Sequence, residues 1–223
     1  MSVIIQNIRY KSRGLSTRIG NPEWVQIGTQ KWATRNLDVT TFRNGDPIPY
    51  VTNPTEWSSG PPTGPFGWRS APAWRYRNDD PTSQRDYSIF YNWYAVNDPR
   101  GLAPEGWHVP TVAEWTTLVV YLGGSSVAGG KLKETGFTYW DSPNTGATNE
   151  VGFSARGTGN IDWPGATTVN MGIRTLFWTA TYSGIDGAGF DRAFFARVDN
   201  ATASTVISTW RAPSGYSVRL IKD

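Results

Sequence analysis

The chain has 223 residues, a formal net charge of +3 and no cysteine. This length suits one large domain or two small ones and is enough to bury a hydrophobic core. The lack of cysteine excludes disulfides, thiolate nucleophiles and zinc–cysteine sites. Lysine and arginine are scattered without a long run, which disfavours a nucleic-acid-binding protein. No apolar stretch is long enough for a membrane-spanning helix.

The first half of the chain predicts an arm, a hairpin, a long loop and a helix. Residues 1–23 are predicted to be an N-terminal extension, and residues 24–223 a single domain. Two short apolar runs, residues 24–28 and 30–33, predict a β-hairpin. Residues 51–81 are rich in Pro, Gly and Ser but threaded with aromatic side chains, which predicts a long loop pinned by those rings rather than a flexible linker.

A helix is predicted from Asp86 to Val96. Ile89, Phe90 and Trp93 are spaced i, i+1, i+4, which is typical of one helical face. Asp86 or Ser88 is its predicted cap, and the segment 97–99 (Asn-Asp-Pro) ends it.

A second helix has the clearest start signal in the chain, within Gly106–Trp115. Thr111 is predicted as its N-cap, with Glu114 as the other half of a capping box. Pro110 keeps the residue before it extended, so the helix does not begin earlier. The helix is expected to run from residue 112 to about 122, with buried side chains at 115, 118, 119 and 122, and to end at the Gly pair 123–124.

The second half predicts turns followed by strands. Residues 129–172 are turn-dominated, with apolar islands, and strands are predicted over residues 177–181, 190–198, 204–210 and 216–221. In the last strand Tyr216, Val218 and Leu220 share one face, as a period of two requires. The helices are not interleaved between the strands, so the fold class is α+β rather than a parallel βαβ sheet.

Several motifs occur in the order found in a known family. They lie in the segments Ile27–Leu37, Tyr91–Val96, Gly106–Trp115, Gly129–Glu134, Asn144–Phe153 and Gly215–Arg219. Together they resemble the Fibrobacter succinogenes major paralogous domain over roughly residues 24–223. The helix start Pro110-Thr111-x-x-Glu114-Trp115 is also similar to the formylglycine-generating sulfatase-modifying family.

The resemblance implies a C-type-lectin-like fold, in which the N- and C-terminal strands meet and two helices pack on small antiparallel sheets with long irregular loops. The same fold carries the variable proteins of diversity-generating retroelements, including phage tail adhesins, whose ligand-contacting residues lie in the C-terminal strands and loops. By position, the equivalent stretch here is Tyr182–Arg211. It departs from the family's Tyr-, Asn- and Ser-rich pattern by carrying interspersed Arg, Phe and Trp.

Catalytic residues are not predicted. His108 is the only histidine, and it has neither a cysteine nor a G-x-S-x-G serine to activate, so it is interpreted as a structural residue at the base of the helix. The oxidase activity of the sulfatase-modifying enzymes depends on cysteine and does not carry over. Glu114 and Glu134 leave a glycan hydrolase as a weaker alternative, because such an enzyme needs two facing carboxylates.

No cofactor is predicted, and calcium is retained only as a candidate ion. Oxygen ligands cluster in two stretches: Asn78, Asp79, Asp80 and Asp86, and Asp141, Asn144, Asn149 and Glu150. Neither stretch has the spacing of an EF-hand loop, and Asn and Asp are also common turn residues.

A binding function is predicted instead, because aromatic side chains beside arginine are typical of binding hot spots. The candidate ligand-binding residues are Tyr182, Asp186, Phe190, Arg192, Phe194, Arg197, Trp210, Arg211, Trp68 and Trp74. Other tryptophans, which lie inside the family motifs, are expected in the core.

The expected partner is a cell-surface protein or glycan, and a homo-oligomer is left open. The first residues lack the basic and apolar segments of a secretory signal. Display on a phage particle is therefore expected, with residues 1–23 docking onto a neighbouring virion subunit. The alternative location is the bacterial surface, after removal of a signal. The alternative function is that of a structural virion or surface component, whose aromatic surface serves only assembly.

Overall fold

A computed structural model describes residues 22–59 and 71–223. It contains short helices and small antiparallel sheets, so the fold is α+β, as predicted. The N-terminal extension lies outside the described residues except for its last two positions. No helix within the described ranges has the length and apolar character needed to cross a membrane.

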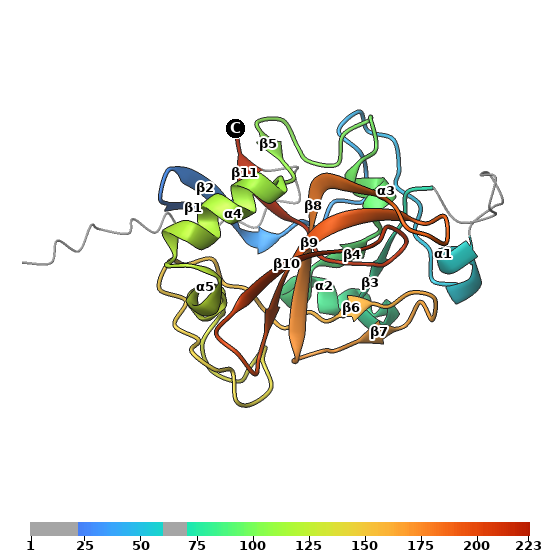
Figure 1. Cartoon of the computed structure of the whole chain (residues 1–223). Helices are drawn as coiled ribbons and strands as arrows, with labels where there is room; N and C mark the ends of the chain where they lie inside the picture. The colour runs from blue at the N-terminus through green and yellow to red at the C-terminus, as the bar shows by residue number, and fades with distance from the viewer. Residues whose placement is uncertain (1–21, 60–70) are drawn as a thin grey trace, which may run out of the picture.

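One sheet joins the two ends of the described chain. Its strand order is β1 (Trp24–Ile27), β2 (Gln30–Asn36), β11 (Arg219–Lys222) and β5 (Trp107–His108), and its pairs are antiparallel. The predicted hairpin is therefore confirmed, and the strand predicted at the C-terminus inserts beside it. Figure 1 shows the C-terminal residue emerging next to β5 and β11.

A second, longer sheet runs through the middle of the molecule (Figure 1). It has the order β10 (Thr205–Arg211), β9 (Asp191–Asp199) and β8 (Arg174–Ile185). Two-stranded sheets are formed by β3 (Trp74–Tyr76) with β4 (Ile89–Tyr91), and by β6 (Asn160–Ile161) with β7 (Thr168–Val169).

The central part of β8 and β9 is covered on both faces, because adjacent residues of a strand point to opposite sides and here pack in different hydrophobic clusters. Trp178 of β8 and Phe195 of β9 belong to one hydrophobic cluster, whereas their neighbours Phe177 and Ala196 belong to another. The alternation predicted for the last strand is also confirmed, because Tyr216, Val218 and Leu220 pack in the first cluster and Ile221 in the second.

Helix α4 (Val112–Tyr121) begins and ends as its sequence predicts. Thr111 Oγ1 accepts from the Glu114 backbone N–H at 3.3 Å, and Glu114 Oε2 accepts from the Thr111 N–H at 2.7 Å, which completes the capping box. Trp115, Leu118 and Val119 are buried. Gly123 and Gly124 follow with φ of +99°, a conformation that favours glycine and stops the helix.

Removing this cap is expected to destabilise the domain modestly. Thr111→Ala leaves the Glu114 backbone N–H without its side-chain acceptor and should lower the free energy of unfolding by about 1 kcal/mol. Urea unfolding, followed by tryptophan fluorescence, measures this change in the free energy of unfolding. Thr116→Ala, at an exposed position of the same helix, is the control and should change stability far less. Equal losses in the two variants would contradict the capping role.

The helix predicted from Asp86 to Val96 is wrong. The segment divides into helix α2 (Gln84–Tyr87), strand β4 and helix α3 (Trp93–Val96). Ser88, a predicted cap, instead has φ of +66° after α2 and ends that helix. Pairing with β3 and burial of Ile89–Tyr91 favour a strand over the local helical spacing. The Asn92 side chain, rather than Asp86, caps α3 by accepting from Ala95 N–H at 3.0 Å.

Further elements lie where loops and turns are predicted. The stretch 51–81 contains helix α1 (Pro54–Ser59), β3, a short 3-10 turn at Arg77–Asp79 and the start of another at Pro81–Ser83, besides residues outside the described ranges. The turn-dominated region 129–172 includes β6, β7 and the end of helix α5 (Ser125–Leu132). Glycines at 129 and 130 lower the helix propensity of α5 and concealed it in the sequence.

Two family motifs meet at α5. The Thr148 N–H donates to Gly130 O at 3.0 Å, and Lys133, just after the helix, is fully buried. Its Nζ donates to Thr145 O at 2.8 Å, to Thr202 O at 2.9 Å and to Asp199 O at 3.0 Å. This ammonium therefore joins the loop 144–153 to the turn between β9 and β10.

Candidate functional site

Several predicted ligand-binding residues of the middle sheet gather at one end, among them Tyr182, Asp186, Arg192 and Trp210. Together with Ile185, which was not predicted, these residues are here called the hairpin end. Tyr182 pairs with Ala193, which pairs with Trp210, so Tyr182 and Trp210 share one face of the sheet. They are 45% and 41% exposed. Arg192 and Arg211 are opposite one another on the paired strands β9 and β10, next to the Ala193 and Trp210 pair.

Aromatic and hydrogen-bonded neighbours hold the exposed rings of the hairpin end. The Tyr182 ring stacks on Trp93 of α3 with 5.6 Å between ring centroids, and its hydroxyl donates to Asp191 Oδ1 at 2.7 Å. Burial and the Asp191 carboxylate raise the pKa of the Tyr182 hydroxyl to about 12, so it stays a donor at neutral pH. The Arg192 guanidinium lies 5.8 Å from the Trp210 ring and donates to Thr209 O at 2.8 Å.

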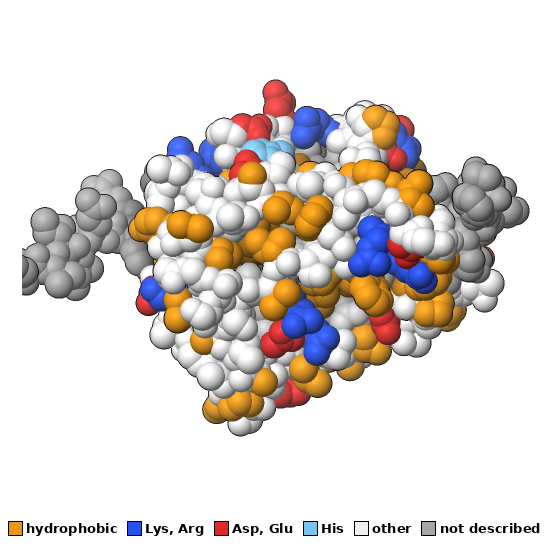
Figure 2. Space-filling view, viewed as in Figure 1, with side chains coloured by type: hydrophobic (Ala, Val, Ile, Leu, Met, Phe, Trp, Pro, Cys, Tyr) orange, Lys and Arg blue, Asp and Glu red, His pale blue; other side chains and the backbone are white. Residues whose placement is uncertain are grey.

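Asp186 organises the turn between β8 and β9. Its Oδ1 accepts from the N–H groups of Ala188 and Phe190, each at 3.0 Å, and its Oδ2 accepts from Arg211 Nε at 2.8 Å. The Arg211 guanidinium covers Phe190, which is buried, so the assignment of Phe190 to a binding surface is wrong. Figure 2 shows basic and acidic side chains side by side among hydrophobic ones on this part of the surface, with no large patch of one sign.

The structure does not bring all predicted residues to this end. Arg197 lies further along β9 and donates to Asp199 Oδ2 at 2.8 Å, and Phe194 is partly buried. Trp74 is buried in the core, where its indole N–H donates to Ile48 O at 2.9 Å, so its assignment to a binding surface is wrong. Trp68 lies outside the described residues.

His108 bridges α4 to the C-terminal residue. Its Nε2 lies 2.8 Å from Glu114 Oε1, and its Nδ1 lies 2.6 Å from Asp223 Oδ1. Burial lowers the pKa of His108, but the hydrogen bonds to these two carboxylates outweigh it and raise the pKa overall. Both ring nitrogens are thus engaged in structural contacts, in agreement with the structural role expected for this residue.

This bridge predicts a pH dependence of stability. Because the folded pKa of His108 is above its ordinary value of 6.5, its contribution is complete below pH 6.5 and is lost as pH rises through the folded pKa. The side chain is partly exposed, so the loss should be below about 1 kcal/mol. Thermal unfolding across this range should show a falling Tm, and His108→Gln should remove that slope. An unchanged slope in the variant would contradict the assignment.

Four carboxylates of the two stretches considered for calcium contact protein donors, whereas the buried Asn144 Oδ1 has no hydrogen-bond partner among the described residues. Asp79 pairs with Arg75, Asp80 accepts from Thr82 N–H at 2.8 Å, and Tyr139 donates to Asp86 Oδ1 at 3.3 Å. In the second stretch Glu150 pairs with Lys131 at 3.0 Å. Across residues 22–59 and 71–223, no group of three or more His, Cys, Asp or Glu side chains is placed to hold a metal ion.

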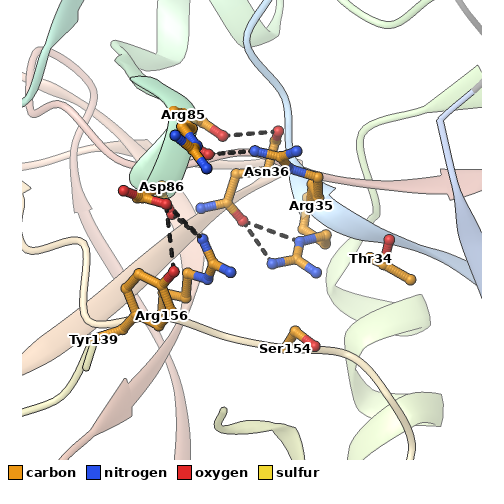
Figure 3. Close-up of a pocket in the computed structure, with 10 residues that line it drawn as sticks. Thr34, Arg35, Asn36, Arg85, Asp86, Tyr139, Ser154 and Arg156 are labelled. Carbon is orange, nitrogen blue, oxygen red and sulfur yellow. Dashed lines mark hydrogen bonds and ion pairs between the residues drawn. The ribbon is translucent and has the colours of Figure 1, made fainter. Parts of the chain in front are cut away.

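A polar cleft of about 440 Å³ was not predicted from the sequence. It is lined by Thr34, Arg35, Asn36, Arg85, Asp86, Ser88, Tyr139, Ser154, Arg156 and Arg219. Figure 3 shows its labelled side chains arranged in a ring, with Arg85 and Asp86 on α2, Thr34–Asn36 on β2, and Tyr139, Ser154 and Arg156 on the long loop after α5. These residues are far apart in the chain, and no spacing pattern connects them.

The comparisons with known proteins identify a family. No curated protein and no solved structure matches the chain. Residues 25–222 match the family described as the Fibrobacter succinogenes major domain, which covers nearly all of the described residues and every motif from which the resemblance was drawn. The chain belongs to the Fibrobacter succinogenes major domain family.

Proposed function

We propose that this chain is a non-catalytic ligand-binding domain with a C-type-lectin-like fold. Three features support the fold: β1 and β11 belong to one sheet, α4 and α5 pack in the cluster beside it, and irregular segments connect the elements. The proposed partner is a cell-surface protein or glycan. The domain that binds it is proposed to be displayed on a phage particle or a bacterial surface.

The observation that carries the binding function is the exposure of large aromatic side chains at the hairpin end. Trp210 and Tyr182 share one face, and Ile185 nearby on β8 is 67% exposed. Exposed aromatic rings beside arginine are the composition of binding hot spots. Because Tyr182 and Arg192 are already hydrogen-bonded, little side-chain freedom remains to be lost on binding.

The absence of catalysis is part of the same proposal. Glu114 is bound to His108 and to Thr111, and Glu134 accepts from Arg156 Nε at 2.7 Å. Each carboxylate named for a hydrolase thus has its own protein partner. Turnover of any glycan that disappears in Glu134→Gln would overturn the non-catalytic assignment.

Binding to intact bacterial cells and to a glycan array tests the proposal. Trp210→Ala and Arg192→Ala should each weaken binding by at least about tenfold, as expected for hot-spot residues. Phe137→Ala is the matched control, because Phe137 is 66% exposed but lies away from the hairpin end. Wild-type binding by both hairpin-end variants would contradict the proposal. Loss of assembly with intact binding would favour the alternative of a structural component.

A further inference from the structure

The polar cleft is electropositive. Four arginines line it, Arg35, Arg85, Arg156 and Arg219, against one lining carboxylate, Asp86. Glu134, which pairs with Arg156 at 2.7 Å, adds a second carboxylate beside the cleft, so the cations still outnumber the carboxylates by four to two. They come from β2, α2, the loop after α5 and β11, so the fold assembles like charges that the chain keeps apart. Like charges gathered around one cavity repel each other and raise the local concentration of anions.

Arg219 is the buried member of this group and has no carboxylate partner among the described residues. Its Nε and Nη2 donate to Asn36 Oδ1 at 3.0 and 2.8 Å, and its Nη1 donates to Ala33 O and Phe153 O. Four of its five N–H groups are thereby used, which leaves one hydrogen of Nη2 without an acceptor. Burial, together with the Arg156 and Arg35 cations, lowers the pKa of Arg219 to about 9, so it remains charged at neutral pH.

The other arginines retain donors for a ligand. Arg156 is held by Glu134 through Nε and by the Asp86 backbone oxygen through Nη1 at 2.7 Å, and its guanidinium covers the Tyr139 ring at 3.7 Å. This fixes its plane and leaves Nη2 unused. Arg35 donates through Nη2 to Arg85 O, and the exposed Arg85 guanidinium makes no hydrogen bond or ion pair with a described residue.

We propose that this cleft binds an anionic sugar, with the arginines contacting its carboxylate or phosphate. Guanidinium groups bind both oxyanions through paired N–H donors. Thr34 of β2 and Ser154 of the loop after α5 also line the cleft. The Thr34 hydroxyl donates to Glu23 O at 3.4 Å and can still accept, and the Ser154 hydroxyl accepts from Asn149 Nδ2 at 3.0 Å and can still donate, which suits a ligand that carries hydroxyls as well as a charge. The volume of about 440 Å³ falls in the range of small-molecule sites. The site shares no residue with the hairpin end, so it stands independently of the proposed function.

Calorimetric titration of the full chain at low salt tests this site. Glucuronate and glucose 6-phosphate are the probes, with glucose and inorganic phosphate as comparisons. At least one charged sugar should bind saturably and more tightly than glucose or phosphate, and added salt should weaken it. Binding of glucuronate alone identifies the carboxylate as the recognised group, and binding of glucose 6-phosphate alone identifies the phosphate.

Variants locate the binding. Arg85→Gln should weaken it by at least about tenfold, because loss of a charged partner of a bound anion has effects of this size. Arg85 is exposed and bonded to nothing through its side chain, so the variant should fold normally. Arg197→Gln, on the middle sheet, is the matched control and should bind as the wild type does. No binding of either charged sugar, phosphate binding as tightly as the sugars, or an equal effect of the two variants would each overturn the proposal.

Discussion

Replacing Lys133 by methionine is expected to lower the free energy of unfolding by about 3 kcal/mol, because three partly buried carbonyl oxygens lose their donor at once. The Nζ of Lys133 contacts Thr145 O, Thr202 O and Asp199 O within 3.0 Å, and the side chain is fully buried. Methionine keeps the apolar stem but supplies no hydrogen. The two loops that the ammonium joins should separate, and the end of α5 should loosen with them.

Lys131→Met, two residues earlier and within α5, is the matched control. Its ammonium lies 3.0 Å from Glu150 Oε1 in a partly exposed pair, which contributes about 0–1 kcal/mol. Urea unfolding of both variants gives the comparison, and hydrogen exchange of the amides in 144–148 and 199–205 locates the loosened segments. A Lys133 variant as stable as the Lys131 variant would show that the buried ammonium is not required.

The second large effect is expected from Gly129→Ala. Alanine is favoured over glycine in a helix by about 1 kcal/mol, so propensity alone predicts stabilisation. A Cβ at this position, however, would lie 2.1 Å from Ser204 O and 2.7 Å from Ser204 C, both backbone atoms. The helix must move away from the turn before β10, and such overpacking costs about 1–3 kcal/mol or more. Net destabilisation is therefore the expected sign.

Gly187→Ala separates this steric effect from a general effect of replacing glycine. Gly187 lies in the turn between β8 and β9, and a Cβ there meets no atom within 4 Å. Its substitution should leave stability unchanged or raise it by less than about 1 kcal/mol. Thermal unfolding of both variants decides the matter, and a Gly129 variant with a Tm at or above the wild-type value would contradict the close approach.

The parts of the fold that sequence reasoning predicted correctly are those with local causes. The capping box of Thr111 and Glu114 marks the start of α4 without reference to any other segment. The helix prediction for Ile89–Tyr91 was wrong because the strand conformation of this segment depends on pairing with β3. The spacing of its own residues does not show that pairing. Helix α5 was missed because the glycines that permit its close packing are poor helix formers.

The candidate sites also differ in whether their residues lie close together in the sequence or are brought together only by the fold. Tyr182, Arg192 and Trp210 were predicted from the resemblance and from the composition of the stretch 182–211, and because they lie on neighbouring strands the structure brings them together. Trp74 was misassigned because an arginine beside a tryptophan does not reveal that the ring is buried. The cleft was not predicted, because its four arginines come from four distant segments and only the folded chain brings them together.

The insertion of β11 beside β2 also has a consequence for synthesis. Arg219 donates to Asn36 across 183 residues and to Ala33 across 186 residues, so this sheet has very high contact order. Contacts so distant in the chain form slowly, since the entropy of closing the loop opposes them until the rest is in place. During translation, the hairpin of β1 and β2 leaves the ribosome long before β11. Its edge stays unpaired until the last residues of this domain emerge.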